Sequence, residues 1–275
     1  MSGKATILYI PHGGGPLPLM GDPGHDTLVR FLRQIPGTLP RPKAVLVISA
    51  HWERDIPLVT AHPRPEMIYD YSGFPKAAYD IRYPAPGAPD LAARVTDCLT
   101  RSGLKARCDE ERGFDHGLYI PLALMLPGAD IPCIQISLCA DLDPLSHLRI
   151  GEALGTMAAP DLSDLWILGS GFSFHNMAAF GSSGPDHDRT EKRNRAFQDW
   201  LRETCAGQGM MPTQRKDRLV RWELAPHARY CHPREEHLLP LMVCAGMAGY
   251  AKAEIVFDGQ VMGRHTLAFL WQGDP

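Results

Sequence analysis

The sequence predicts an α/β fold in which helices flank a central, mixed and mainly parallel sheet. Two observations predict it. Short apolar segments that do not alternate with polar residues are typical of strands buried on both faces. Between them lie amphipathic segments with helical period, and strand alternating with helix is typical of α/β proteins. The 275 residues suffice for one large domain, near the upper limit for a single core.

The apolar segments define the expected strands. Four buried strands are predicted at Thr6–Ile10, Lys43–Ala50, Ile131–Leu138 and Leu165–Gly171. Two more are predicted near the end of the chain, at Ala253–Gly259 and His265–Trp271. This last pair has the pattern of a hairpin, so we expect the sheet to be mixed.

Start and stop signals define the expected helices. Asp26 is expected to cap a helix that continues to Ile35. The segment Pro89–Gly103 has proline at its start and glycine at its end, as helices often do. Further helices are predicted at Ser146–Ala158 and Asp188–Cys205. Residues 62–89 are rich in proline and tyrosine and have no clear period, so they form an ordered loop that either walls a pocket or packs over a sheet edge.

Composition excludes several functional classes. The net charge of −3 leaves no basic surplus for nucleic acid, and no apolar run is long enough to cross a membrane. The N-terminus lacks the layout of a signal peptide. Seven cysteines without a C-x-x-C pair indicate reduced, mostly buried thiols, so a cytoplasmic protein is expected. A homo-oligomer is left open.

Twelve histidines are about twice the usual number, and they form no run. Five stand at notable places: His12, His51, His116, His175 and His237. Three of the five follow predicted strands, at the edge where open α/β sheets bind ligands. Each alone could be a solvated side chain, but together they predict one cleft. The others are expected at the surface or in loops: His25, His62, His147, His187, His227, His232 and His265.

The chemistry open to such a cleft is limited. The glycines of "HGGGP" lack the Lys-Ser/Thr of a phosphate-binding loop, and no G-x-S-x-G elbow for a serine hydrolase occurs. Several neutral imidazoles would bind a borderline metal such as Fe(II) or Zn(II). A further unligated histidine could accept a proton from a catechol hydroxyl. Spacing alone does not choose between a ring-cleaving iron enzyme and a zinc hydrolase.

Six motifs, "PHGGGP", "SAHWE", "YSGFP", "DHGLYIPL", "GSGFSFHN" and "HPREEHLLPL", together resemble the DODA-type (4,5-DOPA dioxygenase-like) members of the class III, LigB-like extradiol dioxygenases. The resemblance covers about residue 7 to about residue 271. It implies a single catalytic domain over residues 1–275 with a non-haem Fe(II) centre. The implied reaction opens the ring of a DOPA-like or other substituted catechol beside its two hydroxyls, with O2 as co-substrate. Zn(II) can occupy such a site in purified protein.

The resemblance also implies roles for residues. His12 and His51 match the first two metal ligands of the family. His237 matches the third, while Glu235 and Glu236 beside it leave a carboxylate ligand open.

His175 matches the acid/base histidine, which could also approach the metal. His116 matches a second catalytic histidine that contacts substrate oxygen. Asp115 is expected either to orient His116 or to cap the helix that follows.

Gly14 and Gly15 stand where the commoner motif has other residues, so three consecutive glycines are expected to open the pocket floor. Tyr71, Phe74 and Tyr83 are expected to wall the substrate pocket, with core packing as the alternative. Two rival functions remain at this stage. One is a zinc-dependent hydrolase on the same histidines, and the other is a non-catalytic, Memo-like binding scaffold.

Overall fold

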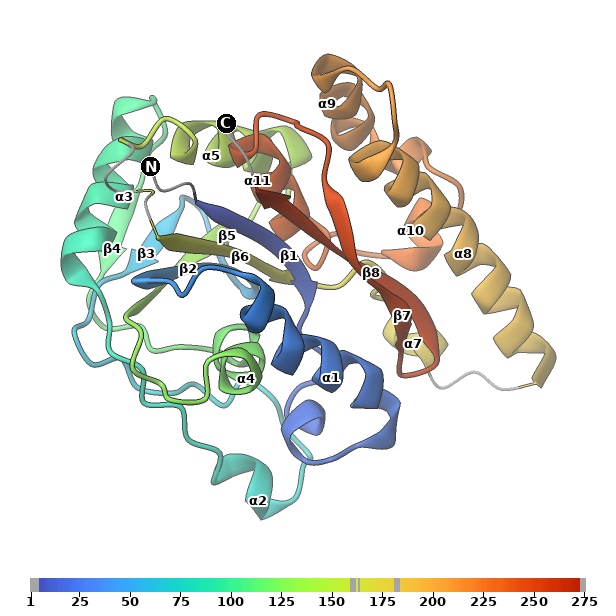
Figure 1. Cartoon of the computed structure of the whole chain (residues 1–275), viewed down its shortest axis with the longest axis horizontal. Coiled ribbons are helices and arrows are strands. Elements are labelled where there is room, and N and C mark those ends of the chain that lie inside the picture. The colour runs from blue at the N-terminus through green and yellow to red at the C-terminus, as the bar shows by residue number, and fades with distance from the viewer. Residues whose placement is uncertain (1–4, 159–161, 163, 181–183, 273–275) are drawn as a thin grey trace.

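The computed structural model describes residues 5–158, 162, 164–180 and 184–272. Within these ranges, strands form one sheet in the order β4-β3-β5-β2-β6-β1-β8-β7 (Figure 1). The strands are β1 (Thr6–Pro11), β2 (Ala44–Arg54), β3 (Leu58–Thr60), β4 (Arg107–Asp109), β5 (Cys133–Cys139), β6 (Leu165–Gly171), β7 (Glu254–Val261) and β8 (Arg264–Gln272). All six predicted strands are present, whereas β3 and β4 are too short for a sequence pattern.

The sheet is mixed, as predicted. Its centre, β5-β2-β6-β1, is parallel throughout. β8 runs antiparallel to both β1 and β7, so the predicted C-terminal hairpin is confirmed. β3 pairs antiparallel with β5 and parallel with β4. Because β2, β6 and β1 are parallel neighbours, their carboxyl ends lie at the same edge of the sheet.

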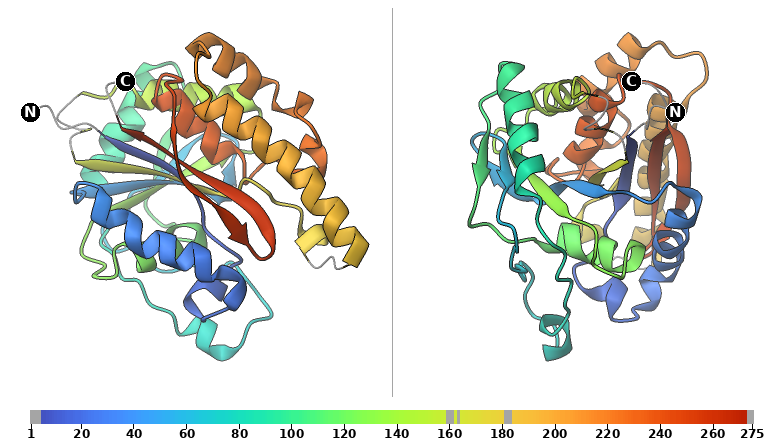
Figure 2. Two further views of the ribbon diagram at one scale, coloured as in Figure 1. Left: turned by 45° about the vertical axis from the view of Figure 1, so that its right-hand side comes forward. Right: turned by 60° about the vertical axis from the view of Figure 1, so that its left-hand side comes forward.

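Helices cover both faces of the sheet (Figures 1 and 2). α1 (Asp26–Gln34) and α4 (His116–Met125) pack on one face. α3 (Pro89–Arg101), α5 (Pro144–Leu154) and α11 (Leu239–Met247) pack on the other, and α8 (Gly184–Ala206) and α9 (Pro212–Val220) extend that layer. Shorter helices are α2 (Lys76–Tyr79), α7 (Met177–Phe180), α10 (Ala228–Cys231) and the 3-10 turns Leu17–Leu19, Pro23–His25, Ile35–Thr38 and Trp222–Leu224.

The central strands are buried on both faces, which explains their unbroken apolar sequences. Every residue of β1, β5 and β6 is buried. Along β1, Leu8 and Ile10 join the core under α1 and α4, while Ile7 and Tyr9 join the opposite core. Burying one such aliphatic side chain contributes about 1.5–3 kcal/mol. The sheet is therefore a rigid support for the side chains at its carboxyl edge.

Element boundaries differ from the predictions at several helix starts. Asp26 is the first residue of α1 instead of its cap, and His25 holds the cap position without a capping hydrogen bond from its side chain. A carboxylate in the first turn still interacts favourably with the helix dipole. α8 begins at Gly184, four residues earlier than predicted. Among the described residues, every helix is too short or too polar to span a bilayer.

Candidate active site

Five histidine rings meet at the carboxyl edge of the sheet. His12 follows β1, His175 follows β6, and His51 lies on β2. His116 is the first residue of α4, and His237 precedes α11. Ring centroids lie 4.8 Å apart for His12 and His51, 3.9 Å for His51 and His116, and 3.4 Å for His175 and His237. The convergence expected from the sequence is therefore present.

His51 lies within a strand, at an irregularity of the sheet. β2 continues to Arg54, so the prediction that the strand ends before His51 is wrong. Ile48 pairs with Ile136 of β5, but the next paired residue of β2 is Glu53, opposite Leu138. β2 therefore advances by five residues where β5 advances by two. Such bulges redirect side chains and are frequent beside active sites.

Asp115 stabilises the layer behind the rings and does not orient His116. Its buried carboxylate accepts hydrogen bonds from Ser49 Oγ (2.8 Å), Gln135 Nε2 (2.7 Å) and Arg112 (3.0 Å). Asp115 occupies the cap position of α4, but its side chain makes no capping hydrogen bond. The predicted cap position of Asp115 is thus confirmed, whereas the predicted orientation of His116 by its carboxylate is wrong. Burial, with a smaller effect of the nearby Asp70, raises the pKa of Asp115.

The carboxylate beside His116 belongs to Asp70, in the long loop. Asp70 Oδ1 lies 2.9 Å from His116 Nδ1 and accepts the backbone N–H of His116 at 3.0 Å. Its other oxygen lies 3.8 Å from His51 Nδ1. Burial opposes ionisation, but the contacts with His116 and then His51 lower the pKa of Asp70 overall. Sequence reasoning missed Asp70 because its segment has no period.

Hydrogen bonds fix the tautomer of His12. Ser170 Oγ donates to the carbonyl of Gly117 at 2.5 Å, so it accepts from His12 Nδ1 at 3.0 Å. His12 Nε2 therefore carries no proton and offers a lone pair, and it lies 3.0 Å from His51 Nε2. A side chain on Gly117 would collide with Ser49 Oγ, since a Cβ atom there would lie 2.7 Å from it. This glycine lets α4 approach β2.

Glu236 connects two of the histidines. Its Oε1 lies 2.9 Å from Nδ1 of His237 and 3.0 Å from Nδ1 of His175, whose rings stack. The carbonyl of His237 accepts from Tyr9 Oη (3.0 Å) and the N–H of Phe172 (2.9 Å). Burial opposes ionisation of Glu236, but the contact with His175 lowers its pKa overall. Glu236 thus directs Nε2 of both rings toward the centre.

The donor set fits a borderline divalent metal. Burial first, and then the neighbouring imidazoles, lower the pKa of His12, His51 and His237 well below the ordinary histidine value. These rings are neutral at neutral pH and offer lone pairs. Two nitrogens about 2.1 Å from one ion and at right angles would lie about 3.0 Å apart, which is the separation of the Nε2 atoms of His12 and His51.

Two groups of possible metal ligands, with no residue in common, can be distinguished. Donor atoms of His12, His51 and His116 lie within 4.8 Å of one another, and so do those of His175, Glu236 and His237. The predicted third ligand, His237, thus falls in the second group, while its ring lies 4.9 Å from that of His51. Glu235, named as an alternative ligand, pairs instead with Arg229.

A cavity of about 310 Å³ opens in front of the five rings. The predicted substrate residues Gly14, Tyr71 and Phe74 all line it. Tyr83 does not: it is buried in the core and its hydroxyl donates to the carbonyl of Leu126. The described residues that line the cavity are His12, Gly13, Gly14, Gly15, Leu17, His51, Tyr71, Ser72, Phe74, His116, Phe172, His175, Met177, Phe180, His237 and Met262.

A buried histidine fixes the glycine loop of this cavity. Gly13 has φ +87°, a conformation that favours glycine. The N–H of Gly14 donates to His25 Nε2 at 3.0 Å, and His25 Nδ1 contacts Asp22 Oδ2 at 2.7 Å. His25 and His232 are fully buried, so neither lies at the surface, but both stand outside the longer helices and strands, His25 in a 3-10 turn and His232 in a loop. The expected surface or loop position is wrong for His147, which is buried within α5.

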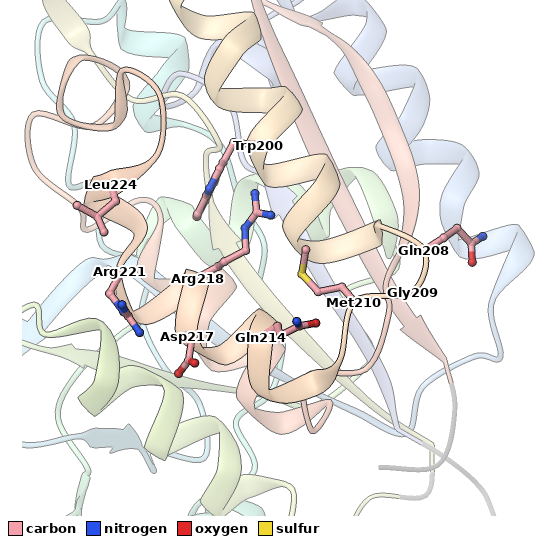
Figure 3. A pocket seen from close by; sticks show the side chains of 9 residues that line it. All are labelled: Trp200, Gln208, Gly209, Met210, Gln214, Asp217, Arg218, Arg221 and Leu224. Atoms are coloured by element: carbon pink, nitrogen blue, oxygen red, sulfur yellow. The ribbon is translucent and has the colours of Figure 1, made fainter.

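A larger hollow, of about 550 Å³, lies elsewhere, over α8 and α9 (Figure 3). The described residues that line it include no histidine or cysteine. The guanidinium of Arg218 lies over the indole of Trp200 and also pairs with Glu203. The described lining of this hollow thus offers no imidazole or thiolate ligand for a metal, so the histidine cavity remains the candidate.

The chain is similar to known proteins over most of its length. Residues 9–266 match the family described as the catalytic LigB subunit of aromatic ring-opening dioxygenase. The chain belongs to this LigB family. It is 37% identical to the dioxygenase tasH of Hapsidospora irregularis, over 98% of this chain and 86% of that protein. It is 39% identical to the 4,5-DOPA dioxygenase extradiol of Beta vulgaris, over 83% of each.

Further LigB relatives extend the comparison. The 4,5-DOPA dioxygenase extradiol of Escherichia coli K12 is 32% identical, over 95% of this chain and 92% of that protein. The crystal structure of the uncharacterized protein JW3007 from Escherichia coli K12 superposes with a TM-score of 0.76, at 27% identity, and covers 97% of this chain and 99% of that one. The predicted fold, the resemblance and the enzyme class, an extradiol ring-cleavage dioxygenase, are confirmed.

Proposed function

We propose that this enzyme uses non-haem Fe(II) and O2 to open the ring of a substituted catechol beside its hydroxyls. The observation that carries the proposal is the cluster of five imidazoles at the closed end of an apolar cavity. Membership of the LigB family supports aromatic ring opening. Deep burial keeps the ligand histidines neutral, which is the protonation state that metal binding requires.

His12, His51 and His237 are the proposed metal ligands. When bound, Fe(II) would supply open coordination positions for a diol and for dioxygen. His237 is preferred to His116 as third ligand because Glu236 accepts from its Nδ1 in good hydrogen-bond geometry. Two hydrogen bonds also fix its carbonyl. A carboxylate on the distal nitrogen is the usual support for a metal-bound histidine.

His175 is the proposed general base. Its Nδ1 faces Glu236, so Nε2 is the nitrogen available to a catechol hydroxyl in the cavity. After His175 takes up that proton, its imidazolium stacks on the His237 ring. The negative charge of the Glu236 carboxylate stabilises this imidazolium. The same nitrogen can return the proton later in the reaction.

His116 and the cavity walls are the proposed substrate contacts. Asp70 contacts Nδ1 of His116, which leaves Nε2 to donate to or accept from a substrate oxygen. Tyr71 and Phe74 present ring carbons to the substrate, since the hydroxyl of Tyr71 donates to the carbonyl of Ala78. The backbone at Gly14 forms the floor, where a Cβ atom would lie 3.0 Å from the Met262 sulfur.

The test is an anaerobic Fe(II)-loaded sample that is mixed with a panel of catechols and then exposed to air. We expect a coloured, ring-opened semialdehyde with Fe(II) and none with Zn(II). Replacing His175 with Ala should preserve iron content and lower turnover about 10²–10⁴-fold, the usual contribution of a general base. Turnover with zinc in the absence of oxygen would reject the proposal in favour of a hydrolase. Failure to bind any metal would favour a scaffold.

A further inference from the structure

The cavity becomes apolar beyond the histidines. The side chains that form its outer walls are Leu17, Tyr71, Phe74, Phe172, Met177, Phe180 and Met262. Ser72 adds one hydroxyl. Among the described residues that line the cavity, none is a lysine, arginine, aspartate or glutamate.

The cavity adjoins a hollow that is lined by arginines. This second hollow, of about 470 Å³, shares His51 and His237 with the cavity. Its cations are Arg54, Arg112 and Arg234. Arg234 donates to both carboxylate oxygens of Glu53, at 2.6 and 2.5 Å, and Arg112 donates to Asp115 at 3.0 Å. Two of these guanidinium groups are thus already paired with carboxylates.

Arg264 follows the cavity residue Met262 closely in sequence but is fully buried. Its guanidinium donates to the carbonyl of Ala179 at 2.5 Å and lies 3.1 Å from His187 Nδ1. Arg264 therefore stabilises α7, which contains Ala179, and does not line the cavity. A negatively charged substituent in the cavity would meet no cationic side chain of the described chain.

From this cavity, and resting on the function proposed above, we infer that the enzyme selects catechols whose ring substituent is neutral and apolar. A carboxylate or zwitterion in these walls would lose its hydration without gaining a partner, which costs on the order of 100-fold in affinity. Each methylene buried there should instead gain about fourfold. The volume of about 310 Å³ is at the small end for ligand sites, so one ring with a short substituent fits.

The experiment compares catechols that differ mainly in charge. 3-(3,4-Dihydroxyphenyl)propanoate and its methyl ester form the matched pair, 4-methyl-, 4-ethyl- and 4-propylcatechol vary the apolar area, and L-DOPA and dopamine add a zwitterion and a cation. Binding is measured by calorimetry without oxygen, and kcat/KM after oxygen is admitted. We expect the ester to exceed the acid about 100-fold in both readouts, with L-DOPA and dopamine also weak.

The outcomes separate this inference from the proposed function. Ring opening with the acid or L-DOPA preferred overturns the inference and leaves the proposed function intact. Preferential binding of the ester and of the longer alkylcatechols, without ring opening, supports the inference and overturns the proposed function. Equal binding of acid and ester overturns the inference whether or not turnover occurs.

A charge introduced at the wall sharpens the test. Met177 lines the cavity and its side chain is 66% exposed, so Met177→Lys should fold. We expect it to shift the acid-to-ester ratio toward the acid by about threefold to tenfold, less at high salt. Met211→Lys is the matched control, because Met211 is similarly exposed (61%) and lies outside the cavity. An unchanged ratio in Met177→Lys, or an equal shift in Met211→Lys, overturns the inference.

Discussion

Three histidines of the active site, His12, His116 and His237, are buried like His25 and His147, but the two groups differ in hydrogen bonding. His147 uses both ring nitrogens, accepting from the N–H of Cys139 and donating to the carbonyl of Asp143. His25 likewise uses both. In the active site, Ser170 or a carboxylate contacts Nδ1 of four rings, and Nε2 is directed to a shared space. Deep burial therefore does not identify a catalytic histidine. What identifies one is an Nε2 atom that faces the other rings of the cluster instead of a backbone partner.

Lowered basicity does not separate the two groups either. Burial lowers the pKa of His25 and His147 as it lowers that of His12 and His237. In the active site the neighbouring imidazoles lower it further, because each positive charge would repel the others. Carboxylates partly offset the effect of burial in both groups, Asp22 for His25 and Asp70 for His51. The neighbouring imidazoles, rather than the burial, distinguish a metal site.

The largest expected effect comes from exchanging the proposed third ligand. His237→Ala should remove high-affinity iron binding and lower kcat/KM at least about 10³-fold, whereas His116→Ala should retain iron and lose turnover. Iron content after anaerobic loading and gel filtration checks this. His147→Ala is the structural control, since it should lose stability and keep its metal. A His116→Ala protein without iron, next to an iron-loaded His237→Ala protein, would move the third ligand to His116.

Removing the carboxylate that serves two rings should have a smaller effect. Glu236→Gln weakens the acceptor for Nδ1 of His237 and His175, so we expect about 10–100-fold lower metal affinity or activity. Anaerobic calorimetry with Fe(II) and steady-state rates measure the two separately. Glu235→Gln is the matched control, because the neighbouring Glu235 pairs with Arg229 instead. Equal losses in the two variants would show that Glu236 has no special role.

The structural histidine of the glycine loop should affect stability more than chemistry. His25→Ala leaves the N–H of Gly14 without its partner, which costs about 1–3 kcal/mol. We expect a Tm lower by roughly 2–10 °C, with unchanged iron content. His62→Ala, at an exposed position, should change stability by less than about 0.5 kcal/mol. Loss of iron in His25→Ala would show that the loop also positions His12.

The fold was predictable because its signals are local. The central strands are uninterrupted apolar segments, and the sheet edge at which His12 and His175 lie follows from parallel neighbours. The bulge at His51 was not predictable, since an irregularity in pairing depends on β5, far away in the sequence. The six family motifs identified the histidines, but the register that brings the rings together appears only in the folded chain.

The supporting carboxylates were harder to find. Asp70 lies in a stretch without period, and only the folded loop brings it to His116. Asp115 has the right spacing for a cap, yet its carboxylate accepts hydrogen bonds from the buried hydroxyl of Ser49 and the amide of Gln135 instead of from the first turn of the helix. Glu236 was noticed beside His237 as a ligand, although its contacts are with ring nitrogens. Sequence adjacency thus marks the region and not the partner.

A pH dependence of stability follows from the lowered pKa values in both groups of histidines. Six histidines have lowered pKa values: His12, His25, His51, His147, His232 and His237. Above about pH 6.5 each is neutral in the folded and unfolded chain, so stability does not depend on them. Below that pH these histidines bind protons in the unfolded chain, whereas in the folded chain they stay neutral until the pH is lower. The free energy of unfolding of the metal-free protein should therefore fall as the pH drops.

His232 allows this slope to be dissected. Burial lowers its pKa to about 3, so it should remain neutral in the folded protein down to that pH. His232→Phe keeps a ring against Phe197 and Trp222, and the carbonyl of Ser173 keeps its bond from Gln198. Between pH 6 and pH 4 the variant should lose about 1.4 kcal/mol less stability per pH unit than the parent. Urea unfolding at pH 8 isolates the packing change, and parallel slopes below pH 6 would mean that His232 takes up its proton in the folded state.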